Sequence, residues 1–170
     1  GAALQYQADV VGEVMVALHA ARVAGLGEST TSWPLQRALL NQTLIRVGEP
    51  DNGIWEIRGE PQLFTHSRAM TWAAFDRGVR AVRDYGLPGQ VQMWESARDA
   101  VRDEIDANAV AAGGWFTQYY GTDEVDASLL VLPAIYLVFG SKTTPSVESP
   151  ATACESGSTV EPEADQGPAQ

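Results

Sequence analysis

The chain of 170 residues is long enough for one domain with a hydrophobic core, and 45% hydrophobic residues is normal for a globular protein. Its formal net charge of −11, without any basic patch carrying interleaved aromatic residues, argues against nucleic-acid binding. Cys154 is the only cysteine, which excludes an intrachain disulfide and a thiolate metal site and favours a reducing, cytoplasmic compartment. No signal-peptide pattern and no apolar run of roughly eighteen residues occurs, so neither secretion nor membrane insertion is expected.

Two helices are predicted before residue 46. Across residues 7–24, apolar side chains recur at helical spacing but also fill other faces, which predicts a helix buried nearly all round. Gly25 and Leu26 then fit a Schellman stop, in which a glycine is followed by a hydrophobic residue. Ser32 can cap the second helix, with Pro34 in its first turn. That helix carries one apolar stripe and is expected to be amphipathic and outer-facing. The stripe comprises Leu35, Ala38, Leu39 and Ile45.

Residues 51–67 bring aromatic, acidic, basic and turn residues together more closely than any other stretch. Turn residues flank residues 54–58, which are therefore predicted to form a short extended loop between two helices. Glu56 lies there among apolar neighbours, and desolvation of that kind favours the protonated form that a general acid needs. The alternative is a structural ion pair between Glu56 and Arg58. The flanking turn residues are Asn52, Gly53, Gly59 and Pro61.

The next two helices repeat the order of a buried helix followed by an amphipathic one. Thr65 or Ser67 can cap the third helix, whose apolar residues cover more than one face up to a stop at Gly86. Pro88 opens the fourth helix, which has an apolar side and a charged side. Alternation of buried inner helices with amphipathic outer helices is what an α/α toroid requires. The predicted fold class is therefore all-α.

The remainder of the chain is predicted to hold a loop, a further helix and a tail. Residues 113–120 begin with glycine and continue with aromatic residues, so we expect an extended loop or short hairpin. Asp123 can cap a fifth helix that runs to Leu132, and Pro133 limits its length. Residues 141–170 contain four prolines and no Leu, Ile, Met or aromatic residue, and are expected to be disordered. The chain thus divides into a helical domain, 1–140, and a disordered tail, 141–170.

Several of these blocks together resemble one known family. Residues 51–59 read Asp-Asn-Gly-Ile-Trp-Glu-Ile-Arg-Gly, 64–68 read Phe-Thr-His-Ser-Arg and 72–77 read Trp-Ala-Ala-Phe-Asp-Arg. These blocks resemble the general-acid segment of glycoside hydrolase family 15, which holds glucoamylases, glucodextranases and the trehalases of mycobacteria and their relatives. Residues 7–14, 116–121 and 126–130 resemble other blocks of the family in matching order. The resemblance covers about residues 4–133.

The resemblance implies a partial (α/α) six-hairpin toroid from an inverting glycosidase that acts on α-glucosides, such as trehalose or short α-glucans. An inverting enzyme needs one carboxylic acid to protonate the leaving oxygen and a second carboxylate, roughly 6.5–9.5 Å away, to activate water. By resemblance Glu56 is the acid. The later Gly-Glu block that carries the family's general base has no counterpart, and Glu13 belongs to an earlier helix motif. The chain is therefore expected to be a fragment that is inactive alone.

Aromatic and polar residues in the resembling blocks are candidates to bind the sugar. Aromatic rings stack on sugar rings, and polar side chains hydrogen-bond to hydroxyl groups. Each candidate taken singly is more often structural. The candidates are Trp55, Trp115, Tyr119 and Tyr120 for stacking, and Gln7, Asp9, Arg58, Thr117 and Asp126 for hydrogen bonding.

No cofactor is evident from the residues, and neither His19 nor His66 has a partner at metal-ligand spacing, so no metal site is predicted. Resemblance to the mycobacterial trehalases implies phosphate and magnesium dependence. The expected partners are an α-glucoside substrate and the C-terminal half of the barrel, with neither nucleic acid nor membrane. The alternative function is a non-catalytic helical-hairpin interaction module or sugar-binding module. The long, residue-rich loop after the second helix favours an active-site origin.

Overall fold

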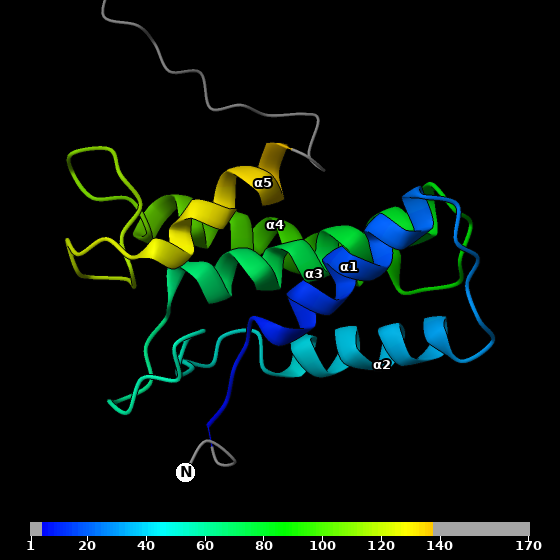
Figure 1. The fold of residues 1–170 in the computed structure, drawn as a ribbon, viewed down its shortest axis with the longest axis horizontal. Helices are drawn as coiled ribbons and strands as arrows, with labels where there is room; N and C mark the ends of the chain where they lie inside the picture. The colour runs from blue at the N-terminus through cyan, green and yellow to red at the C-terminus, as the bar shows by residue number, and fades with distance from the viewer. Residues whose placement is uncertain (1–4, 138–170) are drawn as a thin grey trace, which may run out of the picture.

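The computed structural model describes residues 5–137 (Figure 1). This part of the chain consists of helices joined by loops, and the loops form only isolated β-bridges with one another. An all-α fold is therefore confirmed for this part of the chain. None of its helices is long and apolar enough to cross a membrane. The predicted tail, 141–170, lies outside the described residues. The elements in order are α1 (Val10–Val23), α2 (Ser32–Ile45), α3 (Thr65–Arg83), α4 (Val91–Asn108), the 3₁₀ helix η2 (Ala127–Val131) and α5 (Leu132–Leu137).

Helix α3 runs through the middle of the molecule (Figure 1). Every residue from Thr65 to Val79 is buried, because α1 and α4 pack along α3 and α2 and α5 also contact it. The predicted burial of the third helix is thus confirmed. Two apolar clusters share α3, one around Met70 and Trp72 and the other around Phe75. Helix α4 buries Trp94, Val101 and Ile105 against α3 and exposes its charged face, as its amphipathic pattern predicts.

The predicted burial of α1 on nearly all sides is wrong. One line of residues faces α3 and α2, whereas Val10 is 47% exposed and Val23 is 59% exposed. No other described element covers the opposite face, so apolar residues there stay in solvent. The buried line comprises Gly12, Met15, His19 and Arg22.

The predicted inward stripe of α2 is also wrong, since Leu35 is 60% exposed and Ile45 is 74% exposed. Instead Trp33 and Leu40 are buried together with the polar Gln36 and Thr43. Burial of Gln36 is possible because it accepts a hydrogen bond from Arg22 Nη2 at 3.0 Å and donates to Glu28 Oε2 at 3.1 Å. Hydrophobicity alone gave no sign of this face.

Helix ends follow local signals in part. The Schellman stop after α1 is confirmed: Gly25 has φ +83°, and the amides of Gly25 and Leu26 donate to the carbonyls of Arg22 and Ala21. The predicted Ser32 cap is wrong, because α2 follows Thr31 and makes no side-chain cap there. The predicted fifth helix is also displaced. Asp126, and not Asp123, caps η2 by accepting from the Ser128 amide at 2.7 Å.

The contact between α1 and α3 depends on Gly12. A Cβ atom built at Gly12 would lie 2.2 Å from the Met70 carbonyl oxygen, so Gly12→Ala must push the helices apart. We expect this change to lower the free energy of unfolding by about 1–3 kcal/mol, even though alanine favours a helix over glycine. Chemical denaturation measures the loss. Gly27→Ala is the matched control, because no atom lies within 4 Å of that Cβ; equal losses in both variants would contradict the packing explanation.

His19 makes stability depend on pH. Burial, together with the nearby Arg77 and Arg80, lowers the pKa of this buried imidazole from 6.5 to about 4. The unfolded chain therefore binds a proton more readily, so the stabilisation is present above pH 6.5 and is lost as the pH falls towards about 4. The slope from this one group is at most about 1.4 kcal/mol per pH unit. Urea titrations across this range should show a smaller acid loss in His19→Asn than in the parent chain, and equal losses would exclude His19 as the source.

Candidate functional site

Two loops meet at the N-terminal end of α3. The loop between α2 and α3 and the segment after α4 lie at the same end of the molecule, on the left in Figure 1. Phe64 forms an antiparallel bridge with Tyr119, and the Thr65 amide donates to the Gln118 carbonyl at 3.0 Å. The segment preceding α1 also contacts the first loop. Blocks that are distant in sequence therefore gather at one place.

Asp51 holds the first loop in shape. Its backbone pairs with Gln62, with both N···O distances 2.9 Å, and its carboxylate accepts from the Ala8 amide at 2.9 Å. The Asn52 amide donates to the Tyr6 carbonyl at 3.0 Å. Asp51 is only 2% exposed, and this burial raises the pKa of its carboxyl. The loop is thereby closed at its base and tied to the segment before α1.

Glu56 lies at the tip of this loop with an uncommon backbone conformation. Its φ is +50°, and no other non-glycine residue in the described part of the chain has a positive φ. Such a conformation costs about 1–2 kcal/mol and is found at functional sites more often than elsewhere. The turn is closed by bonds from the Glu56 amide to the Gly53 carbonyl, 3.1 Å, and from the Ile57 amide to the Asn52 carbonyl, 3.0 Å. Gln5 Nε2 adds a bond of 3.2 Å to the Glu56 carbonyl.

The side chain of Glu56 differs from the sequence-based expectation. Glu56 is exposed, Trp55 is 58% exposed and Ile57 is 37% exposed, so the predicted apolar enclosure of the carboxyl is wrong for these residues. The alternative ion pair is absent too, because Glu56 and Arg58 make no salt bridge within residues 5–137. Arg58 is also exposed, on the same loop tip. Both charged groups thus point to solvent.

Trp55 and Asp126 connect the two loops directly. The indole Nε1 donates to both carboxylate oxygens of Asp126, at 3.0 and 3.1 Å. Gln118 Nε2 donates to the same carboxylate at 3.3 Å. Although partial burial acts to raise it, the pKa of Asp126 lies below its usual range, because Ser128 and Trp55 donate hydrogen bonds to the ionised form. Asp126 is therefore a fixed anion beside the residue that precedes Glu56.

Gln7 and Asp9 approach from the segment before α1. Gln7 Nε2 donates to the Gly53 carbonyl at 3.5 Å, within the Glu56 turn. Asp9 is 2% exposed and lies 3.8 Å from His66 Nδ1, at the start of α3. No protein group in the described residues donates to Asp9 Oδ1, although this atom is buried. A buried acceptor without a partner is uncommon and is available to a hydroxyl donor.

Thr117 and Tyr119 lie in the second loop and make contacts within the protein. The Thr117 hydroxyl is buried and donates to the Ala109 carbonyl at 3.2 Å. The Tyr119 ring packs edge-on against Phe64, with ring centroids 5.8 Å apart. Trp115 is 47% exposed in the same loop. These contacts explain how the loop is held, and a direct role in sugar binding stays a prediction for Thr117 and Tyr119.

Sequence reasoning missed four residues that shape the site. From the sequence, Asn52 is only a turn residue, and His66 is only a histidine without a partner at metal-ligand spacing. Gln118 lies inside the aromatic block that was singled out, so the block itself was the available signal. Gln5 had no signal, because its contact with Glu56 depends wholly on how the chain folds.

A metal site is not formed by the residues of this region. Among residues 5–137, no group of three or more His, Asp, Glu or Cys side chains is placed to hold a metal ion.

Comparison with known proteins gives a consistent result. The family model of glycosyl hydrolases family 15 matches residues 1–155. A trehalase of Mycobacterium tuberculosis (strain ATCC 25618 / H37Rv) is 37% identical over 134 residues, which is 78% of this chain and 19% of that protein. A trehalase of Thermoplasma acidophilum is 33% identical over 132 residues, which is 77% of this chain and 23% of that protein. The chain thus spans about a fifth of the length of these curated relatives. No solved structure matches.

The backbone of Glu56 can be tested without an assay of activity. Glycine adopts a positive φ without the clash that a Cβ causes, so Glu56→Gly should raise the free energy of unfolding by roughly 0.5–1 kcal/mol. Guanidinium denaturation measures this change. Glu60→Gly is the control, since Glu60 is an exposed loop residue without positive φ and should lose a few tenths of a kcal/mol. A loss of stability in Glu56→Gly as large as in the control would show that the residue is not strained.

Proposed function

Because the chain belongs to glycoside hydrolase family 15, we propose that it forms the general-acid part of an inverting glycosidase that acts on α-glucosides, with trehalose the favoured substrate. The hydrogen bonds between Trp55 and Asp126 carry this proposal. They join two separate family-like blocks beside Glu56, so that an acid, an aromatic ring and a fixed anion lie together. Trehalose is favoured because the relatives named above are trehalases.

In the proposed reaction Glu56 protonates the glycosidic oxygen as the bond to the anomeric carbon breaks. The closed turn from Asn52 to Ile57 fixes the backbone from which this carboxyl projects. The side chain of Glu56 is exposed in the described structure, and we propose that bound substrate and the aromatic residue beside it cover this side chain. Trp55 precedes Glu56 in the sequence and is held by Asp126, so we propose that its ring helps to cover the Glu56 carboxyl.

Substrate hydroxyl groups have two charged acceptors available. Asp126 is an ionised carboxylate that already accepts from Trp55 and Gln118, and Asp9 has a buried oxygen without a protein donor. Carboxylates bind hydroxyl groups through short, charge-assisted hydrogen bonds. Gln7 and Arg58 supply donors at the rim of the same loop. We propose that these residues orient one glucosyl unit against Glu56.

The second carboxylate, which activates water, is proposed to come from a polypeptide segment outside residues 5–137. The support is that the chain spans only about a fifth of the length of its relatives, and that the matching residues contain no family-like Gly-Glu block. This segment would be the rest of the barrel, and we propose a cytoplasmic location for the assembled enzyme. The described residues alone are then proposed to be inactive.

Activity measurements test the proposal. The chain alone should release no glucose from trehalose, maltose or isomaltose. Joined to the remaining segment of a related trehalase, it should become active, and Glu56→Gln should then lower kcat about 10²- to 10⁴-fold, because an amide cannot donate the proton. Glu60→Gln, on the same loop, is the control and should retain activity. Full activity of the Glu56→Gln variant, or hydrolysis by the isolated chain at the rate of the joined enzyme, would exclude the proposed roles.

A further inference from the structure

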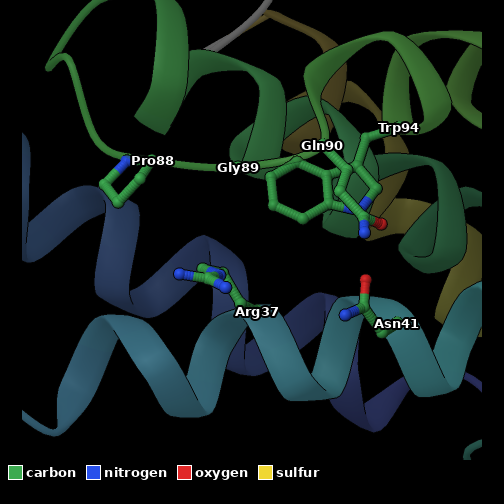
Figure 2. Close-up of a pocket in the computed structure, with 6 residues that line it drawn as sticks. All are labelled: Arg37, Asn41, Pro88, Gly89, Gln90 and Trp94. Atoms are coloured by element: carbon green, nitrogen blue, oxygen red, sulfur yellow. The ribbon is translucent and has the colours of Figure 1, made fainter.

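A hollow lies at the opposite end of α3 from the Glu56 loop. It is located between α2 and the segment that leads into α4, and its volume is about 230 Å³ (Figure 2). The α3–α4 connection lies on the right in Figure 1, whereas the candidate catalytic loops lie on the left. The hollow is therefore separate from the site described above. Its lining residues are Arg37, Asn41, Pro88, Gly89, Gln90 and Trp94.

Trp94 is fixed rigidly beside this hollow. Its side chain is 0% exposed and packs edge-on against Trp33, with ring centroids 6.2 Å apart. The absence of side chains at Gly78 and Gly89 makes room for the ring, since a Cβ at Gly89 would lie 2.5 Å from it. A ligand that displaces the exposed Arg37 and Gln90 side chains would thus meet a preformed aromatic wall, with little entropy lost in ordering it.

The two neighbouring indole groups differ in their hydrogen bonding. Trp33 Nε1 donates to the Pro88 carbonyl at 2.9 Å. Trp94 Nε1 is buried, and no protein group in the described residues accepts from it. Leaving a buried donor without an acceptor costs about as much as losing a hydrogen bond, so such groups usually serve a partner.

On α2, a buried acceptor that also lacks a protein partner faces Trp94. Figure 2 shows the amide oxygen of Asn41 pointing across the hollow towards Trp94 and Gln90. This oxygen, Oδ1, is also buried and receives no hydrogen bond from the described protein. Arg37, one helical turn earlier, is exposed and makes no ion pair within the described chain. The hollow thus offers a buried donor, a buried acceptor and a free guanidinium at its mouth.

We propose that this hollow binds a small neutral polyhydroxyl compound, of the size of glycerol or a monosaccharide. A hydroxyl group both accepts and donates hydrogen bonds, so the hydroxyl groups of such a compound can supply the acceptor that Trp94 Nε1 lacks and the donor that Asn41 Oδ1 lacks. Arg37 and Gln90 are long, exposed side chains that can move aside and then donate to further hydroxyl oxygens.

An anion fits the hollow less well than a hydroxyl compound does. A carboxylate could accept from Trp94 and Arg37, but it has no proton for Asn41 Oδ1 and would place two acceptors against each other. The chain is also strongly acidic, with a formal net charge of −11, which repels anions at long range. The chemistry of the pair Trp94 and Asn41 therefore selects a hydroxyl donor.

Nuclear magnetic resonance of the tryptophan indole N–H groups tests the proposal on the full chain. The Trp94 signal is assigned from the Trp94→Phe variant, and D-glucose, glycerol and inorganic phosphate are titrated separately. D-glucose or glycerol should move the Trp94 signal saturably. Asn41→Leu should weaken this binding about tenfold or more, because the buried acceptor is removed.

Gln42→Leu is the matched control, since Gln42 is exposed on α2 and does not line the hollow. It should bind the polyols as the parent chain does. Circular dichroism confirms that each variant is folded, and Arg37→Ala, an exposed position, gives a second variant that should weaken binding if Asn41→Leu does not fold. A Trp94 signal that responds to neither polyol, that responds to phosphate instead, or that responds equally in Asn41→Leu would overturn the proposal. Glu56→Gln should leave this binding unchanged, which separates it from the proposed catalytic function.

Discussion

Burial of α3 on every side is the constraint on which the rest of the described structure depends. A helix in such a position must satisfy its charged groups internally, because an unpaired buried charge is very costly. Asp76 therefore pairs with Arg77 and with Arg80, the latter at 2.9 Å, and Arg68 pairs with Glu104 of α4 and with the Val47 carbonyl. The two Arg68 contacts also fix α4 and the segment after α2 relative to α3. Helix α3 thus determines the position of each loop at its ends.

The N-terminal end of α3 is where this constraint brings the loops of the proposed site together. Because Phe64 and Thr65 pair with the second loop, Asp126 is brought to Trp55 from a distant part of the sequence. The Glu56 turn can then adopt a backbone conformation that an isolated loop would avoid, since bonds from Gln5 and Asn52 hold it in place. Rigid supports and a strained tip are a common arrangement where a protein must aim one side chain.

The C-terminal end of α3 is organised by the packing of one aromatic ring, that of Trp94. Gly78 and Gly89 leave space that the Trp94 ring fills, and the ring fixes the connection to α4 against α2. The packing is close at the ring but leaves its N–H group without a protein acceptor. Two polar atoms without protein partners, Trp94 Nε1 and Asn41 Oδ1, thereby lie beside the hollow, away from the loops that carry Glu56 and Asp126.

The sequence by itself determined the features that arise from local chemistry. The helical spacing, the glycine stop at Gly25, the apolar residues on several faces of α3 and the loop that carries Glu56 all depend on residues close together in the chain. The blocks around Trp55 and Asp126 indicated the family. Only the tertiary structure decided which face of α1 and α2 is buried and that Trp55 bonds to Asp126. A helix with apolar residues on several faces buries whichever face a neighbour covers, and Gln36 is buried because Arg22 and Glu28 satisfy it. Such choices depend on partners that are distant in sequence, so no local pattern can contain them.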